Sequence, residues 1–321
     1  MNKKERVLRA VKGMEADRVP AGFWLHFPEH MHNGDEAVHA HIDFYQKTNT
    51  DILKIMNENL VPYNTPITKA EDWKNIRPLS LKDDFIVRQL DIIKRITDQL
   101  GDEAVILTTI HGTIASAFHA RGGGENYDAL RTVLSSHLRE QPEIVSNAFR
   151  ILSEGMAEFV HACLEAGAQG IYYSALGGER ELFTDEEFET HIKDNDLMIL
   201  NAAKNASAFN VLHICKDNVN FNRYTDYHPE VVNWAIHEND LSLPEGKQLF
   251  PESVILGGLD DRSGVLVNGT QEEIEQAVFK TLDKIGTRRF ILGADCTLPT
   301  ELSYEQIKLA VEATCKYKTK S

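Results

Sequence analysis

Two residues in one short apolar run, and a third far along the chain, have side chains of the kinds that bind zinc. His213 and Cys215 are separated by one residue in the run Asn210–Cys215, which is predicted to be a strand. Because successive side chains of a strand point to opposite faces, His213 and Cys215 point the same way. Cys296 follows another predicted strand, Arg288–Gly293. Imidazole and thiolate are preferred zinc ligands, and three protein ligands with an open fourth position define a catalytic zinc site.

The chain has only four cysteines among 321 residues, too few for a disulfide framework. Cys163 and Cys315 fall in predicted helices, where we interpret them as small hydrophobic core residues. An H-x-C pair alone is a weak signal. The third ligand at a matching strand end is what favours a metal site formed by His213, Cys215 and Cys296.

These ligands need a framework of strands, and short apolar runs recur along the whole chain. Continuous apolar runs are typical of strands that are buried on both faces. The predicted strands are Val19–His26, Asp51–Asn57, Ala104–Ile110, Gln169–Ser174, Asn210–Cys215, Val231–Ile236, Ser253–Leu259 and Arg288–Gly293.

Amphipathic helical patterns alternate with these runs, in Leu81–Leu100, Pro142–Ala166, Gln271–Ile285 and Ser303–Lys316. Eight strands joined by helical crossovers predict a single (β/α)8 TIM barrel that spans residues 1–321 as one domain. The alternative is an open doubly wound sheet. It is weakened because no glycine-rich nucleotide-binding turn follows the first predicted strand.

Polar residues stand where the predicted strands end, and in a barrel the C-terminal strand ends carry the active site. We expect four of them to contact a substrate, although rim residues are often merely solvated: His26, Asn57, His111 and Glu179. Asp260 and Asp295 are candidates to hydrogen-bond a ligating histidine. Tyr172 and Tyr173 are predicted to be core and barrel-lining residues. The run Arg121–Gly124 indicates a loop more than a phosphate cradle.

The formal net charge of −15 is unfavourable for binding nucleic acid or an anionic membrane surface. No run reaches the roughly 18 apolar residues that a membrane helix needs, and residues 1–14 lack the apolar stretch of a signal peptide. We therefore expect a cytoplasmic protein without nucleic-acid or membrane partners. Nothing in the sequence indicates its oligomeric state.

Three segments give the chain a resemblance to the uroporphyrinogen decarboxylase superfamily. They are ERVLRAVKGMEADRVP at the start, HIC followed by VVNWAIHEND in the middle, and VILGGLDDRSGVLVNGTQEEIEQAV leading into FILGADCTLPTELSYEQIKLAVEA. One branch of this superfamily contains the decarboxylases of haem synthesis. Another contains zinc methyltransferases, marked by H-x-C and a distant Cys, which here are His213, Cys215 and Cys296.

The resemblance to the methyltransferase branch implies a zinc ion and a methylcorrinoid carried by a partner protein. It also implies a small-molecule acceptor, either a thiol such as coenzyme M or tetrahydrofolate. The decarboxylase branch carries an arginine-rich M-R-Q-A-G-R-Y motif after its first strand, where this chain has FWLHFPEHM. Uroporphyrinogen decarboxylation is therefore the alternative function. A non-catalytic corrinoid- or metal-binding protein is a second alternative.

In the related methyltransferases an acidic residue at the end of strand six can complete the zinc shell. Alignment of the strand ends places His237 there, with Glu238 next to it. The resemblance therefore implies His237 as the fourth ligand, with Glu238 as the alternative.

Overall fold

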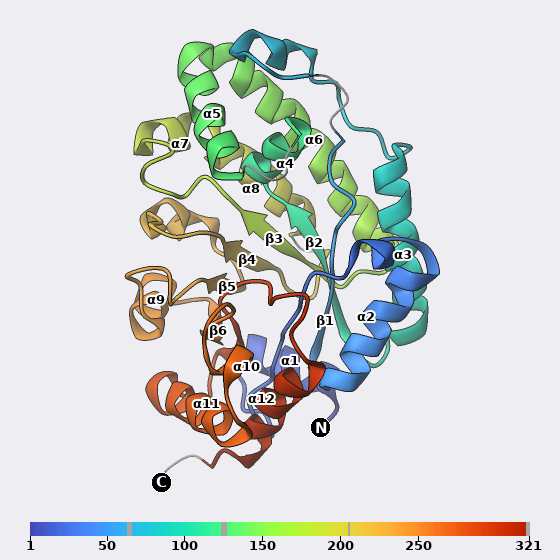
Figure 1. Ribbon diagram of the computed structural model, residues 1–321, viewed down its shortest axis with the longest axis vertical. Helices are drawn as coiled ribbons and strands as arrows, with labels where there is room; N and C mark the ends of the chain where they lie inside the picture. Colours follow the sequence, from blue (N-terminus) through green and yellow to red (C-terminus); the bar gives the residue numbers. More distant parts are fainter. Residues whose placement is uncertain (63–65, 123–126, 205, 319–321) are drawn as a thin grey trace.

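The computed structural model describes residues 1–62, 66–122, 127–204 and 206–318, in which seven strands form one curled parallel sheet (Figure 1). Each strand pairs with its neighbour in sequence, from β1 to β7. A doubly wound sheet reverses its strand order, so that alternative is wrong. The strands are β1 Ile52–Ile55, β2 Val105–His111, β3 Gly170–Ala175, β4 Val211–Ile214, β5 Val231–Trp234, β6 Val254–Leu259 and β7 Phe290–Ala294.

Helices lie around the outside of the sheet, with α6 and α8 at the top of Figure 1 and α11 and α12 at the bottom. All seven strands are almost fully buried, as expected for a parallel sheet covered by helices. The α-helices are α1 Lys3–Val11, α2 Gly34–Thr48, α3 Asp84–Leu100, α4 Thr113–Ala120, α5 Tyr127–Glu140, α6 Pro142–Glu165, α7 Asp185–His191, α8 Lys193–Ala203, α9 Leu243–Leu249, α10 Val265–Asn268, α11 Gln271–Ile285 and α12 Tyr304–Lys316. Short 3₁₀ helices are η1 Glu29–Met31, η2 Ala70–Asn75 and η3 Phe221–Tyr227.

The helix predictions agree with the structure to within a few residues. Thr270 caps α11: its hydroxyl accepts a hydrogen bond from Glu273 N, and the Glu273 carboxylate accepts one from Thr270 N. Ser303 caps α12 by accepting from Glu305 N. No helix in the described residues is long and apolar enough to span a membrane. The predicted loop Arg121–Gly124 lies partly outside the described residues, since 123 and 124 are not among them.

The predicted first strand, Val19–His26, is not a regular strand, which corrects the count of eight. It forms two isolated parallel bridges, from Ala21 to Leu292 and from Leu25 to Leu298. Pro20 has no N–H to donate to a ladder, and its carbonyl accepts from Leu292 N at 2.9 Å. Apolar composition therefore predicted the position of this segment but not its irregular hydrogen bonding.

A buried carboxylate fastens this segment to β1 at the end of the sheet remote from the predicted metal ligands. Asp51 is 0% exposed and accepts from Arg6 Nη1 at 2.8 Å, Arg18 Nη1 at 2.7 Å and Ala21 N at 2.8 Å. Its own N–H donates to Ala21 O at 2.8 Å. Arg6 also binds Asp17, at 2.6 Å from Nε. These contacts join α1, the irregular segment and β1.

Candidate metal centre

The three predicted ligands come together where β4 and β7 end. His213 lies in β4, Cys215 follows β4 directly, and Cys296 lies two residues beyond β7. One ligand atom from each residue lies within 4.8 Å of the other two, and no other group of three such residues forms among those described. His213 is 2% exposed, while both cysteines are half-buried. A donor set of one imidazole and two thiols, reachable from one side, fits a zinc ion.

Asn233 determines which nitrogen of His213 is free to bind a metal. The Asn233 amide nitrogen donates to Leu256 O at 2.9 Å and to Ala294 O at 3.1 Å. Its oxygen must therefore be the atom that lies 2.6 Å from His213 Nδ1. An amide oxygen only accepts, so Nδ1 carries the proton and Nε2 keeps its lone pair. Nε2 is the atom that faces Cys296 Sγ, at 3.4 Å.

Tyr172 supports the same histidine from β3. Its ring stacks on His213 with centroids 5.3 Å apart, and its hydroxyl donates to Asn233 Oδ1 at 2.9 Å. Tyr172 was predicted to be core and lining, and it is 2% exposed. It fixes both the imidazole and the amide that orients the imidazole.

The two thiols differ in acidity because they interact with each other. A hydrogen bond from Cys215 lowers the pKa of Cys296 well below its usual value, and His213 adds to this effect. The same bond, together with burial, raises the pKa of Cys215. These opposite shifts favour the thiolate form at Cys296 over Cys215, and thiolate is the form that binds metals.

A lysine lies beside this cluster that the site prediction did not include. Lys54, in β1, is 5% exposed, and its Nζ lies 4.2 Å from the centroid of the Tyr172 ring and 5.0 Å from that of Trp24. Burial lowers the pKa of Lys54 to about 7, although Cys296, Glu58 and Cys215 oppose the shift. The sequence did hold a signal, because Lys54 is the one charge inside the apolar run of residues 52–56.

A buried carboxyl group follows β6, at the same edge of the sheet as the three candidate ligands. Asp261 follows β6 and is 2% exposed, and its Oδ2 has no hydrogen-bond partner among the described residues. Burial raises the pKa of Asp261 to about 7, and the charge on Cys296 adds to the shift. Arg262 Nε lies 3.7 Å from Asp261 Oδ2 and opposes the shift.

His237 and Glu238 lie outside the group formed by His213, Cys215 and Cys296. The Nδ1 atom of His237 lies 2.9 Å from Asp295 Oδ2, and the same oxygen accepts from His237 N at 2.8 Å. The bond to Asp295 raises the pKa of His237. Asp295 thus binds Nδ1 of His237, and within the described residues Nε2 forms no hydrogen bond. Glu238 Oε1 instead pairs with Arg262 Nε at 3.1 Å.

With this geometry in place, comparison with protein families gives one decisive match. The family model for uroporphyrinogen decarboxylase (URO-D) matches residues 2–317, nearly the whole chain. The chain belongs to the uroporphyrinogen decarboxylase family. The resemblance seen in the sequence is thereby confirmed.

Two curated proteins and a solved structure, each named as a methyltransferase, are similar to this chain at low sequence identity. The methylcobamide:CoM methyltransferase MtbA of Methanosarcina acetivorans is 25% identical over 252 residues, covering 78% of this chain and 70% of that protein. The MtbA of Methanosarcina mazei is 24% identical and 98% of each chain is covered. A solved methyltransferase structure from Methanosarcina mazei superposes with a TM-score of 0.75 at 18% identity, covering 98% of this chain and 99% of that one. The structural likeness shows a shared fold.

In this family member the four residues expected to contact a substrate lie in different surroundings. His26 is exposed and bonds Glu58 Oε1 at 2.7 Å, while Asn57 is buried and accepts from Asn59 N at 3.1 Å. His111 ends β2 with its ring 4.6 Å from that of His119, and burial lowers its pKa well below the usual value. Substrate contact by these three residues stays a prediction.

Glu179, the fourth, is 0% exposed. It pairs with Arg131 and accepts from Gly177 N at 2.8 Å, which fastens the loop after β3. Gly177 has a φ of +92°, a conformation that glycine adopts without strain. Glu179 therefore has a structural role that the sequence did not indicate, and contact with substrate stays a prediction for it too.

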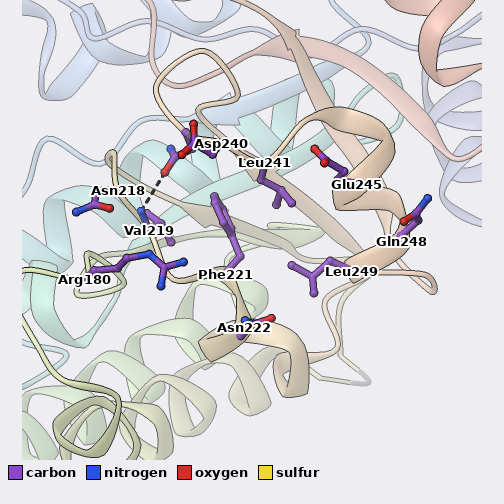
Figure 2. A pocket seen from close by; sticks show the side chains of 11 residues that line it. Arg180, Asn218, Val219, Phe221, Asn222, Asp240, Leu241, Glu245, Gln248 and Leu249 are labelled. Carbon is purple, nitrogen blue, oxygen red and sulfur yellow. Dashed lines mark hydrogen bonds between the residues drawn. The ribbon is translucent and has the colours of Figure 1, made fainter.

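A pocket of about 470 Å³ opens beside the loop that follows Cys215, between η3 and α9 (Figure 2). Phe221, Leu241 and Leu249 give it an apolar wall, and Arg180 and Asp240 lie at its edge. None of the three candidate ligands lines it. The pocket is connected to the metal centre through Asn239, one of its lining residues. Asn239 Nδ2 donates to Lys216 O at 2.8 Å, and its Oδ1 accepts from Val219 N at 3.0 Å, so this side chain holds the loop that follows Cys215.

Proposed function

We propose that this protein is a zinc-dependent methyltransferase that moves a methyl group from a methylcorrinoid, carried by a partner protein, to a thiol. The observation that carries the proposal is the group formed by His213, Cys215 and Cys296, with His213 Nε2 directed at Cys296 Sγ. Two relatives whose similarity extends over most of the chain are named methylcobamide:CoM methyltransferases, and their names support the same reaction. Tetrahydrofolate is the alternative acceptor.

His213, Cys215 and Cys296 would hold the zinc ion, with Asn233 and Tyr172 keeping the imidazole in its metal-binding tautomer. When bound there, zinc would lower the pKa of the acceptor thiol so that the thiolate persists at neutral pH. Methyl transfer then breaks the cobalt–carbon bond and forms a sulfur–carbon bond, and the electron pair of the broken bond stays on cobalt. Asp261, which follows β6 and interacts electrostatically with Cys296, is the group that we propose as the acceptor of the thiol proton.

Uroporphyrinogen decarboxylation is the less favoured function. A substrate with eight carboxylates needs several cations, and charge-assisted bonds from arginine are the usual means. The segment of residues 23–31, FWLHFPEHM, contains no arginine, and the chain carries a net charge of −15. A non-catalytic corrinoid- or metal-binding role is also less favoured, because ionisable groups converge on the centre from several different strands.

The sheet is proposed to close as a single (β/α)8 barrel domain, with residues 19–26 taking the place of the eighth strand. Ala21 O accepts from Asp51 N, before β1, and Gly22 N donates to Leu292 O, in β7. The segment therefore bonds towards both edges of the seven-stranded sheet. A site of two unpaired thiols fits a reducing compartment, so we place the protein in the cytoplasm.

Methyl transfer from methylcobalamin to a panel of thiols and to tetrahydrofolate tests this function, with the purified protein loaded with zinc. We expect thiol methylation that depends on zinc, and no turnover of uroporphyrinogen I or III. Decarboxylation near 1 s⁻¹ or faster, the rate of an ordinary enzyme, would restore the alternative. Loss of methyl transfer on zinc removal, and its return on readdition, would separate enzymatic transfer from slow uncatalysed methylation.

His237 is proposed as the fourth ligand of the resting site, with Glu238 as its rival. Its free Nε2 supports this role, although the side chain must move to join the group of three. We expect His237→Ala to keep most of its zinc through the other three ligands. It should bind a thiol at least as tightly as the wild type, because no protein ligand has to leave.

Zinc content and thiol dissociation constants of His237→Ala and Glu238→Ala provide the measurement. If Glu238 is the ligand, His237→Ala leaves both quantities unchanged and Glu238→Ala shifts them. Complete zinc loss in His237→Ala would mean that the three remaining ligands do not form a sufficient site.

A further inference from the structure

A buried lysine close to the candidate metal centre has no ion-pair partner among the described residues. Lys54, in β1, is 5% exposed, and its Nζ lies 4.2 Å from the centroid of the Tyr172 ring and 5.0 Å from that of Trp24. Glu58, four residues along the chain, gives its Oε1 to His26 instead, at 2.7 Å. Buried lysines are rare unless they are paired, so this ammonium group requires a negative charge from another source.

Lys54 is coupled to the metal centre through the ring of Tyr172. That ring stacks on His213, with centroids 5.3 Å apart. The charges of Cys296 and Cys215 act on Lys54 and favour its protonated form, with Cys296 the stronger of the two. An ammonium group at Lys54 therefore interacts in turn with the net charge of the metal centre, because electrostatic interaction is mutual.

The net charge of the metal centre changes when a thiol binds as its thiolate. A divalent ion held by the thiolates of Cys215 and Cys296 and by a neutral His213 has a net charge of zero. The acceptor thiolate adds one negative charge, and Asp261 is neutral once it has accepted the thiol proton. Lys54 supplies a positive charge of equal size, so the metal, its ligands and the ammonium group are together neutral. The ammonium and the bound anion each offset the desolvation cost of the other.

We propose that Lys54 is the counter-charge of the metal centre, which stabilises an anionic ligand on the metal and so favours the acceptor as its thiolate. The inference rests on the proposed function, because it assumes that the candidate centre holds a metal ion. Lys54 acts through its charge and makes no bond to the metal. The rings of Tyr172 and Trp24 hold the ammonium group in position without neutralising it.

Exogenous ligands of different charge test this role, with Co²⁺ in place of Zn²⁺ so that visible absorption reports binding to the metal. Azide is an anion, imidazole is neutral, and 2-mercaptoethanol has no charge except that of its thiolate. In Lys54→Met we expect the dissociation constants of azide and 2-mercaptoethanol to rise about 10-fold or more, and that of imidazole to change by less than about twofold, because one unit charge has been removed from the interior. Lys54→Arg should retain most of the wild-type preference. A purely structural role for Lys54 would not distinguish the ligands by charge.

Cobalt content and circular dichroism should be unchanged in Lys54→Met, because the substitution removes a buried charge and leaves the three metal ligands intact. Lys54→Gln is a second variant without the charge, and the same selectivity is expected of it. Lys3→Met is the matched control, because Lys3 Nζ also lies over a tyrosine ring, Tyr45, at 4.1 Å, but at the remote end of the sheet. Its three dissociation constants should equal those of the wild type. Equal weakening of imidazole and azide in the Lys54 variants, or no weakening of azide, would overturn the proposal.

Azide separates the failure of this inference from the failure of the proposed function, because azide is an anion but not a thiol. If thiols do not bind to the metal of the wild type, the proposed acceptor fails, while a selective loss of azide binding in Lys54→Met still supports the role of Lys54. If the wild type binds and methylates thiols and Lys54→Met binds all three ligands as the wild type does, the inference is refuted and the proposed function stands.

Discussion

Alanine at Cys215 or at Cys296 is expected to abolish zinc binding while the fold survives. The wild type should bind about one zinc ion per chain, and each variant should lose at least about 100-fold in affinity. Outer-shell changes alone typically cost 10- to 100-fold, and these variants remove a ligand itself. The fold should persist because a catalytic zinc ion sits on a preformed framework, here a parallel sheet with its own buried core.

Metal analysis after dialysis, together with circular dichroism and thermal unfolding, measures both parts of this prediction. Cys315→Ala is the matched control, because Cys315 is exposed on α12 and this variant should keep its full zinc content. Full metal content in either Cys215→Ala or Cys296→Ala would eliminate the proposed centre.

The exposure of Cys315 also shows that our interpretation of this residue as part of the core was wrong, whereas Cys163 is buried as expected.

Asp51→Ala is expected to produce the largest loss of stability, about 3–5 kcal/mol in the free energy of unfolding. The substitution leaves the buried guanidinium groups of Arg6 and Arg18 without the carboxylate that they share. It also removes the acceptor for Ala21 N, in the segment that stands where the sequence predicted a first strand.

Urea unfolding followed by circular dichroism provides the measurement for Asp51→Ala. Asp17→Ala is the control, because Asp17 also binds Arg6 but has a side chain that is 41% exposed. An exposed pair contributes about 1 kcal/mol or less, so Asp17→Ala should be much milder. Equal effects of the two substitutions would show that burial of Asp51 does not set the strength of this connection. The folded fraction of Asp51→Ala should still bind zinc at the opposite end of the sheet.

The three candidate ligands could be predicted because their side-chain types are rare and their positions follow strand periodicity. A strand places His213 and Cys215 on one face, and parallel strands bring their C-terminal ends to one edge, which also delivers Cys296. Asn233 could not be predicted as their partner. Its role depends on the register that pairs it with His213, and an asparagine inside an apolar run carries no sign of that register.

Other features were missed for similar reasons. Glu179 resembled a polar rim residue, and only the fold reveals that Arg131, 48 residues away, buries it in an ion pair. Seven of the eight predicted strands are present, because runs of buried apolar residues are a direct signal. Residues 19–26 share that signal, yet proline and local hydrogen bonding, which the apolar pattern does not report, keep them from forming a regular strand.

X-ray absorption at the zinc edge, with and without an added thiol, tests the central claim most directly. The zinc-loaded protein should show two sulfur ligands at about 2.3 Å, from Cys215 and Cys296, with nitrogen completing part of the shell. Addition of 2-mercaptoethanesulfonate should raise the sulfur count from two to three. A spectrum without sulfur ligands, or one that the thiol leaves unchanged, would contradict the account.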